Sequence, residues 1–246
     1  MSKTPSKVAI VTGASRGIGK AIALKLASDG FVVAIGYAGN HEQACQTVAE
    51  IQTNGGSALA VQGDVSNPDD VDRLFSTVLE VFGQVDAVVS NAGVMDLAPI
   101  KTANVDVFDR IMATNVRGTF LVLAKATEVL KEGGRIVALS TSVIAKATPG
   151  YGPYIASKAA VEGLVHVLAN ELRGRNITVN AVAPGPVNTE LFMKGKTKEQ
   201  VEMLTKMSPL ERLGQPVDIA NAVSFLLGKE GGWVNSQVVR VNGGFA

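Results

Sequence analysis

Short apolar runs rich in β-branched residues alternate with amphipathic stretches from one end of the chain to the other. Such runs are typical of buried strands, and apolar residues spaced three or four apart are typical of helices that pack on them. The predicted strands are 7–11, 31–36, 57–62, 85–89, 134–139, 176–182 and 237–241. The predicted helices are 17–29, 41–54, 68–82, 104–130, 152–173 and 216–227. This alternation predicts an α/β fold in which a parallel sheet of about seven strands carries helices on both faces.

Composition and charge narrow the class of protein further. The chain has 246 residues, of which 46% are hydrophobic, and a formal net charge of +1. These values are typical of one compact domain, here 1–246, and they give no reason to expect a nucleic-acid partner. No apolar run approaches the ~20 residues of a membrane span, so no membrane partner is expected. Residues 1–6 contain no apolar signal region, and we expect a cytoplasmic protein.

The cysteine and the histidines add no expected chemistry. Cys45 is the only cysteine, so no internal disulfide can form, and its predicted helical position among apolar residues favours a packing role over a nucleophilic one. His41 and His166 are far apart in the sequence and lack ligand partners. We therefore predict no metal site.

A glycine-rich turn follows the first predicted strand and opens the first predicted helix. Its sequence, 12–19, places glycines at positions 13, 17 and 19, a spacing that differs from G-x-G-x-x-G. Glycines permit a tight turn and let a pyrophosphate approach the backbone at the positive N-terminus of the helix. Because the turn lies between a strand and a helix, we interpret it as a dinucleotide-binding turn rather than an ordinary one.

A tyrosine and a lysine four residues apart form a candidate acid–base pair. Tyr154 and Lys158 lie on the predicted helix 152–173, where this spacing places both on one face. A free tyrosine has a pKa of about 10, and a nearby ammonium favours the phenolate and lowers that pKa. The pair is therefore suited to move a proton to or from a carbonyl or an alcohol.

Several motifs occur together and in order. They are Thr12-Gly13-x-x-x-Gly17-x-Gly19, Ser90-Asn91-Ala92-Gly93, Asn115, Ser140-Thr141-Ser142, Tyr154-x-x-x-Lys158 and Pro184-Gly185. In this order and spacing, from Lys7 to Gly244, the chain resembles the short-chain dehydrogenase/reductase family. Ser90 stands where the family often has Asn. The resemblance implies a Rossmann-type doubly wound sheet and a nicotinamide cofactor.

The expected cofactor is NADP(H). An NAD site usually has Asp or Glu after the second strand, and here Tyr37-Ala38-Gly39-Asn40 contains neither. Arg16 supplies a permanently charged fork for a 2′-phosphate. By resemblance, Asp64 receives the adenine amino group, although it is equally suited to cap a turn, and 184–189 flanks the nicotinamide. The full expected cofactor-binding set is Gly13, Ser15, Arg16, Gly17, Ile18, Gly19, Tyr37, Asn40, Asp64, Val65, Asn91, Ala92, Gly93, Tyr154, Lys158, Pro184, Gly185, Val187 and Thr189.

The resemblance also assigns the catalytic residues. Tyr154 is the acid–base group, Lys158 lowers its pKa, and Asn115 kinks its helix and holds a water in a proton path to the lysine. The hydroxyl that polarises the substrate carbonyl is Ser142 or Thr141. The commonest family spacing favours Thr141, but the local pattern Ser142-Val143-Ile144-Ala145 favours Ser142, which we prefer.

The expected function is reduction of a ketone or aldehyde by NADPH. By resemblance, the expected activity is that of a 3-oxoacyl-[acyl-carrier-protein] reductase, with an acyl thioester as substrate and acyl carrier protein as a candidate partner. The segment 155–186 also resembles polyhydroxynaphthalene-reductase-like members, which reduce polyhydroxy-aromatic ketones. A polyol or sugar dehydrogenase and a nucleotide-sensing regulatory protein are the alternatives. Substrate choice is expected in 94–100, 143–151 and 186–213. By resemblance the segment 186–213 is a flexible cover over the substrate, and a mobile surface loop is the alternative. Apolar residues on more than one face of helices 104–130 and 152–173 predict a homotetramer.

Overall fold

A computed structural model describes residues 6–246 and contains one parallel, seven-stranded sheet. The strands are β1 (Val8–Thr12), β2 (Val32–Tyr37), β3 (Ser57–Gln62), β4 (Ala87–Ser90), β5 (Arg135–Leu139), β6 (Thr178–Pro184) and β7 (Val238–Val241). Their spatial order is β3-β2-β1-β4-β5-β6-β7. This order confirms the predicted doubly wound, Rossmann-type fold, and each predicted strand is present with its ends shifted by at most a few residues.

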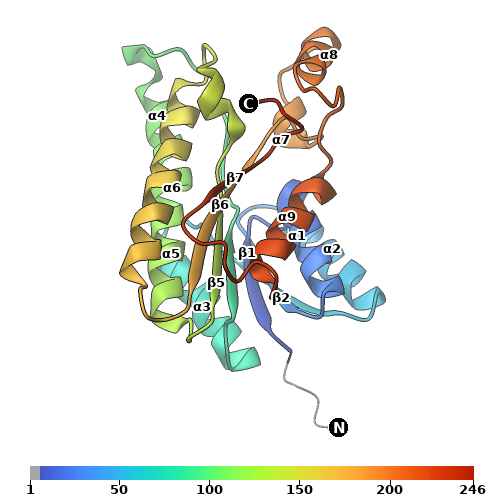
Figure 1. Cartoon of the computed structure of the whole chain (residues 1–246), viewed down its shortest axis with the longest axis vertical. Helices are drawn as coiled ribbons and strands as arrows, with labels where there is room; N and C mark the ends of the chain where they lie inside the picture. The colour runs from blue at the N-terminus through green and yellow to red at the C-terminus, as the bar shows by residue number, and fades with distance from the viewer. Residues whose placement is uncertain (1–5) are drawn as a thin grey trace.

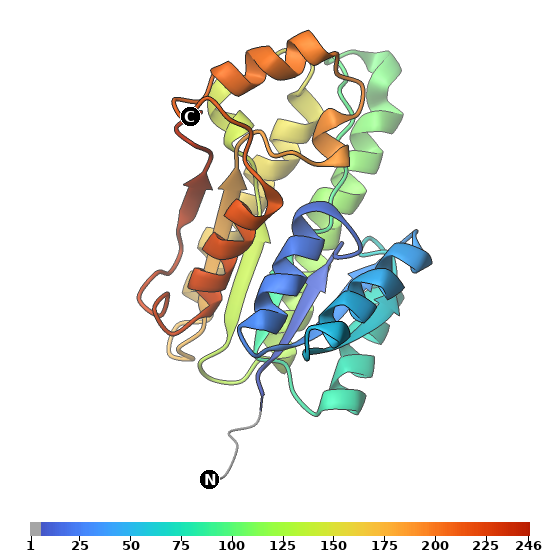
Figure 2. The same ribbon diagram turned by 90° about the vertical axis from the view of Figure 1, so that its right-hand side faces the viewer.

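Helices cover both faces of the sheet (Figure 1). The long helices are α1 (Gly17–Ser28), α2 (His41–Thr53), α3 (Pro68–Phe82), α4 (Val105–Met112), α5 (Gly118–Val129), α6 (Gly152–Glu171) and α9 (Pro216–Leu227). Helices α1, α2 and α9 lie on one face and are turned toward the viewer in Figure 2, while α3, α5 and α6 cover the other face. The predicted helices are therefore confirmed as layers around one sheet.

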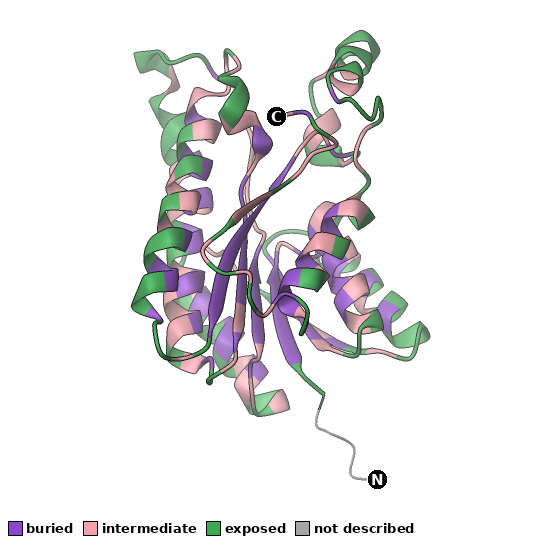
Figure 3. Cartoon of the chain, viewed as in Figure 1, coloured by how far each residue is buried: buried purple, intermediate pink, exposed green. Residues whose placement is uncertain are grey.

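The central strand β1 shows why the pattern of the sequence gives this arrangement. Successive side chains of a strand point to opposite faces. Val8 and Ile10 pack among α3, α5 and α6, whereas Ala9 and Val11 pack among α1, α2 and α9. All five residues of β1 are buried because both faces are covered, and Figure 3 shows the same burial along the centre of the sheet.

The predicted helix 104–130 is interrupted in its middle. It begins after the 3₁₀ turn Thr102–Asn104 and contains a π-helical turn, Ala113–Arg117, between α4 and α5. Asn115 lies in this turn and is buried. Asparagine is a poor residue for a helix interior, and π turns are frequent at functional sites.

The segment 186–213 contains more structure than the sequence suggested. It forms two short helices, α7 (Glu190–Met193) and α8 (Lys198–Lys206), rather than a featureless cover. Thr189 caps α7, and Thr197 with Gln200 forms a capping box at the start of α8. The sequence reasoning missed both helices because each is too short to show an apolar period.

Two further observations apply to the described residues. None of the helices within 6–246 is both long and apolar enough to cross a bilayer. The same residues contain no group of three or more His, Cys, Asp or Glu side chains that could hold a metal ion.

Candidate active site

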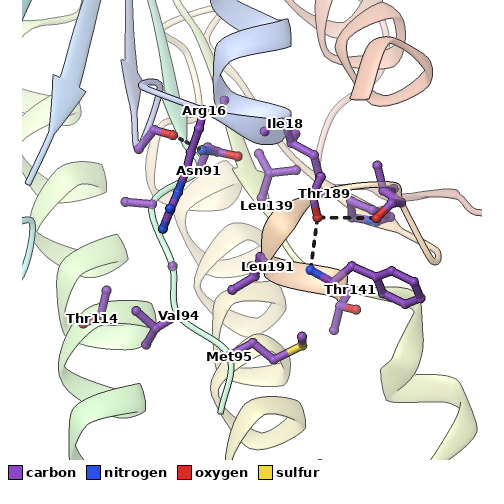
Figure 4. A pocket seen from close by; sticks show the side chains of 18 of the residues that line it. Arg16, Ile18, Asn91, Val94, Met95, Thr114, Leu139, Thr141, Thr189 and Leu191 are labelled. Carbon is purple, nitrogen blue, oxygen red and sulfur yellow. Dashed lines mark hydrogen bonds between the residues drawn. The ribbon is translucent and has the colours of Figure 1, made fainter. Parts of the chain in front are cut away.

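A large cavity lies at the carboxyl ends of the strands, where the order of the sheet reverses between β1 and β4. Doubly wound sheets bind ligands at this point. The cavity has a volume of about 960 Å³ and extends from the glycine-rich turn to α7 and α8 (Figure 4). Every residue of the expected cofactor set lines this cavity, so the fold brings together residues that are up to 176 positions apart, from Gly13 to Thr189 (189 − 13).

The glycine-rich turn leaves no room for side chains at two of its glycines. A Cβ on Gly13, whose φ is +64°, would lie 2.8 Å from the Ala92 Cα. A Cβ on Gly19 would overlap the Gly13 carbonyl oxygen and lie 2.5 Å from the Asn91 Nδ2. The close approach of β1, α1 and the loop after β4 therefore requires glycine at both positions.

Asn91 ties the end of β4 to this turn. Its Nδ2 donates to the carbonyl oxygens of Thr12, at 2.9 Å, and Gly13, at 3.0 Å. Its backbone N–H donates to the Thr12 Oγ1 at 3.0 Å. The side chain expected to bind cofactor thus also fixes the geometry of the glycine-rich turn.

The Arg16 side chain extends from the glycine-rich turn and forms an ion pair with the segment 186–213, which we call the lid. Its Nη1 donates to the Glu190 Oε2 at 2.9 Å, and both side chains are largely exposed. Among residues 6–246, the other donors of this guanidinium make no hydrogen bond. Tyr37, at the end of β2, is only 5% exposed, and its hydroxyl lies 2.6 Å from the His41 Nδ1. The corner between Arg16 and Tyr37 contains no acid from 37–40.

Asp64 and the segment 184–189 are also expected to contact the cofactor, and both have local structural roles as well. Asp64 accepts hydrogen bonds from the backbone N–H and the hydroxyl of Ser66 at 2.9 and 2.8 Å, which is the turn-capping role considered as its alternative. Thr189 accepts from the Phe192 N–H at 3.2 Å and so starts α7 (Figure 4). A Cβ on Gly185 would lie 2.8 Å from the Asn242 Cα, so the 184–187 segment runs tightly against the C-terminal strand.

Tyr154 and Lys158 lie together on α6, but their electrostatics differ from the expectation. Burial raises the pKa of Tyr154 to about 12, and the opposing effect of the nearby Thr141 hydroxyl is smaller. Burial lowers the pKa of Lys158 to about 8. The Lys158 amine donates to the Leu139 carbonyl oxygen at 2.7 Å and lies 6.0 Å from the centroid of the Tyr154 ring. The expectation that Lys158 lowers the pKa of Tyr154 is therefore not met in this structure, where burial raises that pKa and the Thr141 hydroxyl opposes the rise.

The structure corrects the preference for Ser142 over Thr141. Ser142 is only 1% exposed, donates to the Ala183 carbonyl oxygen at 2.8 Å and accepts from the Asn242 Nδ2 at 2.9 Å. It does not line the cavity, whereas Thr141 does and interacts with the Tyr154 phenol. The residue in the family's commonest spacing is thus the one that faces the cavity, and the local resemblance of 142–145 to the usual motif was misleading.

Asn115 does not line the cavity either. Its Oδ1 accepts from the Val94 N–H at 2.8 Å, and its Nδ2 donates to the Val94 carbonyl oxygen at 2.9 Å and to the Ser157 hydroxyl at 3.0 Å. A Cβ on Gly93 would lie 3.2 Å from the Asn115 Oδ1 and 3.4 Å from the Lys158 Nζ. Asn115 therefore holds the loop after β4 beside the lysine rather than contacting Tyr154.

The remaining wall of the cavity comes mainly from the three segments expected to choose the substrate, and apolar side chains are the majority there, although Asn188 and Glu190 of 186–213 line it too. Sequence reasoning named the segments but could not name the side chains, because no motif marks them. They are Val94, Met95, Val143, Thr148, Tyr151, Leu191, Phe192, Met203, Leu204 and Met207. Phe245, near the C-terminus, also lines the cavity and lies outside all three segments.

A glycine-rich turn on a doubly wound sheet, with a tyrosine and a lysine at the far end of the same cavity, defines a nucleotide-dependent oxidoreductase site. The comparisons with known proteins agree. A family model described as "Enoyl-(Acyl carrier protein) reductase" matches residues 13–246. A "Short-chain type dehydrogenase/reductase" from Picea abies is 47% identical over 97% of this chain and 92% of its own length.

Two further proteins extend the comparison. An "NADPH-dependent aldehyde reductase-like protein, chloroplastic" from Arabidopsis thaliana is 42% identical over 97% of this chain and 94% of its own length. The crystal structure of a short chain dehydrogenase from Burkholderia cenocepacia, in complex with NADP, has a TM-score of 0.92 and 36% identity, and covers 97% of each chain. This chain belongs to the short-chain dehydrogenase/reductase family, as the sequence motifs predicted.

Proposed function

We propose that residues 1–246 form a single catalytic domain that reduces a ketone or aldehyde to an alcohol with NADPH. The observation that carries this proposal is the placement of Tyr154, Lys158 and Thr141 at one end of a cavity whose other end is the glycine-rich turn. The name of the Arabidopsis relative and the NADP bound to the Burkholderia structure support the same cofactor.

The residues present fit NADP(H). The tight backbone at Gly13 and Gly19 lets a pyrophosphate reach the N-terminus of α1, where the helix dipole favours negative charge. The absence of an acid at 37–40 avoids repulsion of a 2′-phosphate, and Arg16 retains free guanidinium donors beside that corner. We expect a preference for NADPH over NADH of at least about tenfold, which corresponds to about 1.4 kcal/mol.

In this proposal Tyr154 supplies the proton. When bound, the nicotinamide supplies hydride to the carbonyl carbon of the substrate. Because the pKa of Tyr154 is about 12, the phenol stays protonated at neutral pH and can donate to the carbonyl oxygen. The charged form of Lys158, whose pKa is about 8, stabilises negative charge that develops on that oxygen or on the phenolate.

Thr141 supplies the second hydroxyl. A hydroxyl can donate one hydrogen bond, and Thr141 faces the cavity beside Tyr154. It therefore polarises the carbonyl in this proposal, and Ser142 fixes the backbone behind it through Ala183 and Asn242. Asn115 acts as a positioning residue for the loop that passes Lys158.

The side chains that line the substrate end of the cavity favour a largely apolar carbonyl compound that contains a ring. Methionine and aromatic side chains dominate it, and Thr148 and Tyr151 provide the polar groups on the α6 side. Polyhydroxy-aromatic ketones of the kind expected from the sequence fit this description. A 3-oxoacyl thioester on acyl carrier protein is the second candidate, because the description of the matching family model names that carrier. A polyol or sugar fits the apolar wall least well.

A homotetramer stays part of the proposal, on a narrower basis than the sequence suggested. Leu123, Val161 and Val165 are buried within the monomer and do not form an outer stripe. Phe120, which is 54% exposed, and Val167, which is 57% exposed, remain as apolar groups on the outer sides of α5 and α6. A mass by light scattering equal to the 25.5 kDa monomer at micromolar concentration would exclude the assembly.

The cytoplasmic compartment expected from the sequence also remains a proposal. Localising the tagged full chain in its own cells would test it. Recovery of the protein from a plastid or another organelle would contradict it.

A carbonyl panel tests the activity itself. Wild-type protein and Tyr154→Phe are each mixed with NADPH and, in turn, an aromatic ketone, an aldehyde, a 3-oxoacyl thioester and a ketose, and the loss of absorbance is recorded. We expect wild type to reduce an aromatic ketone or aldehyde best and Tyr154→Phe to lose most turnover while still binding NADPH. Binding of NADPH with no turnover of any class would instead favour a nucleotide-sensing regulatory protein.

A further inference from the structure

Phe245 is a buried aromatic residue at the substrate end of the cavity. It lines the cavity and is only 6% exposed. Within residues 6–246 it belongs to neither of the two hydrophobic clusters that pack on the faces of the sheet. The Lys146 Nζ lies over its ring, 5.0 Å from the centroid, and a cation in this position stabilises the ring where it is. The core of the fold therefore does not explain why this ring is buried.

The backbone that carries Phe245 is tied to the residue next to Thr141. The Asn242 carbonyl oxygen accepts from the Phe245 N–H at 3.1 Å, and the Asn242 Oδ1 accepts from the Gly244 N–H at 2.9 Å. The Asn242 Nδ2 donates to the Ser142 Oγ at 2.9 Å. The turn that carries Phe245 is therefore held on one side by the segment that presents the Thr141 hydroxyl to the cavity.

The end of the lid holds the same turn from another side. The Ser208 hydroxyl, which is buried, donates to the Gly243 carbonyl oxygen at 2.6 Å. Gly243 has a φ of +62°, and a Cβ there would lie 2.5 Å from the Ser208 Oγ, so this contact requires glycine. Figure 1 shows the C-terminus at the same end of the molecule as α7 and α8, as the contact requires. Phe245 is thus packed between the segment 143–151, through Lys146, and the lid, through Ser208.

A ring held in this way forms a wall that cannot move aside easily. Close-packed side chains give way to larger neighbours only at a cost, so such a wall rejects substrate groups that overlap it. Aromatic rings also attract each other in offset or edge-to-face arrangements, which favours an aromatic substrate group that fits. Because Phe245 lines the same cavity as Thr141 and Tyr154, its ring bounds the space left for the rest of a carbonyl compound that binds these two hydroxyls.

We propose that Phe245 is a further specificity-determining residue, whose ring limits the size of the aromatic group next to the substrate carbonyl. This inference rests on the proposed reduction of a ketone or aldehyde with NADPH. A fused ring added to that group on the Phe245 side overlaps the Phe245 side chain. The residue contacts the substrate and takes no part in proton transfer, so it acts on the choice of ketone and not on cofactor binding.

Phe245→Ala tests the inference because it removes the ring and leaves the backbone contacts. The matched control is Phe225→Ala, which makes the same change on α9 at a residue that is 48% exposed and does not line the cavity. The value of kcat/KM is measured with NADPH for tetralone, a ketone with two fused rings, and for its three-ring homologue tetrahydroanthracenone. Phe245→Ala should raise the ratio of three-ring to two-ring kcat/KM at least about tenfold over wild type. Phe245→Leu should raise it less, Phe245→Trp should lower it, and Phe225→Ala should leave it within about twofold.

The outcomes separate this inference from the proposed function. An unchanged ratio in Phe245→Ala, or equal losses of kcat/KM for both ketones, overturns the role of Phe245 and leaves the proposed function in place. Reduction of other carbonyl compounds by wild type, but of neither ketone, overturns the inference in the same way. If wild type reduces no carbonyl compound with NADPH, the proposed function fails and the inference fails with it.

Cofactor binding shows whether each variant keeps its fold. Fluorescence titration should give NADPH binding within about twofold of wild type in every variant, because none of the substitutions lies at the cofactor end. If Phe245→Ala does not fold, Phe245→Leu makes the same test, since it keeps most of the buried apolar volume and still removes the ring.

Discussion

The two ends of the cavity are held in different ways. At the cofactor end, the backbones of β1, α1 and the loop after β4 approach so closely that Gly13 and Gly19 admit no side chain, and Asn91 bonds across the gap. At the substrate end, two ion pairs hold α7: Arg16 pairs with Glu190, both exposed, and the exposed Lys194 pairs with the half-buried Asp96. Close packing is intolerant of change, whereas exposed ion pairs contribute little. The cofactor end should therefore be rigid and the segment 186–213 adaptable.

The largest expected effect is a difference in kcat between variants of the two neighbouring hydroxyl residues, Thr141 and Ser142. Thr141→Val should lower kcat by about 10²–10³, or ~2.7–4 kcal/mol, because it removes the donor that faces the carbonyl. Ser142→Ala keeps that donor and should cost much less in kcat. It should lower the melting temperature instead, because it removes the side-chain hydrogen bonds of Ser142 to the Ala183 carbonyl oxygen and from the Asn242 amide. Steady-state kinetics and thermal melts on both variants measure this, and the reverse order in kcat would restore Ser142 as the donor.

The second prediction compares one glycine from each end. A methyl group on Gly19 meets backbone atoms that cannot move freely, so Gly19→Ala should weaken NADPH binding by about 3 kcal/mol, roughly 100-fold. Gly195, after α7, has a φ of +73° with nothing within 4 Å of an added Cβ. Gly195→Ala should cost only about 1 kcal/mol of stability and leave NADPH binding unchanged. Equal losses of cofactor affinity would mean that the two ends are not held differently.

The third prediction concerns how the free energy of unfolding depends on pH, and it compares the buried Lys158 with the exposed Lys194. The pKa of Lys158 is lowered to about 8 by burial, so between pH 8 and 10.5 the unfolded chain binds a proton that the folded chain does not. The free energy of unfolding should therefore rise by about 2 kcal/mol from pH 8 to 9.5 through this group. The raised pKa of Tyr154 acts with the opposite sign, but only above about pH 10.

Matched variants isolate the contribution of Lys158. Urea unfolding of Lys158→Met should lack this rise, whereas Lys194→Met, at an exposed position on the lid, should keep it. The same pH slope in wild type and Lys158→Met would show that the amine is not held with a lowered pKa.

The smallest expected effect comes from removing the two ion pairs of α7, Arg16–Glu190 and Lys194–Asp96. The double variant Glu190→Gln with Lys194→Met removes both ion pairs, and exposed pairs contribute ~0.2–1 kcal/mol each. We expect kcat/KM to fall by about twofold to 30-fold at low salt, which corresponds to ~0.4–2 kcal/mol for both pairs. The difference from wild type should shrink at high salt, because ions screen these pairs. A loss that is large and independent of salt would show that α7 is held by something stronger than its ion pairs.

The same contrast explains what could be predicted from the sequence. Strand and helix patterns and the glycine spacing reflect local constraints, so the sheet and the position of the glycine-rich turn at the cofactor end could be predicted. The other expected residues of that end, such as Asp64 and 184–189, came from the family resemblance. The helices α7 and α8 are too short to show periodicity, and the partners of Ser142 are 41 and 100 positions away in the chain. The pKa of Tyr154 depends on burial by residues from several segments of the chain. These features arise from tertiary contacts that no local pattern records.

The central claim is that this cavity transfers hydride from NADPH to a substrate carbonyl with Tyr154 as the proton donor. The most direct test uses NADPH in which both C4 hydrogens of the nicotinamide are deuterium, together with the carbonyl compound that wild type consumes fastest. The alcohol is then analysed by mass spectrometry. Wild type should give an alcohol with one deuterium on the carbinol carbon, and Tyr154→Phe should give almost no alcohol although that variant still binds NADPH. An alcohol without deuterium on that carbon, or full turnover by Tyr154→Phe, would contradict it.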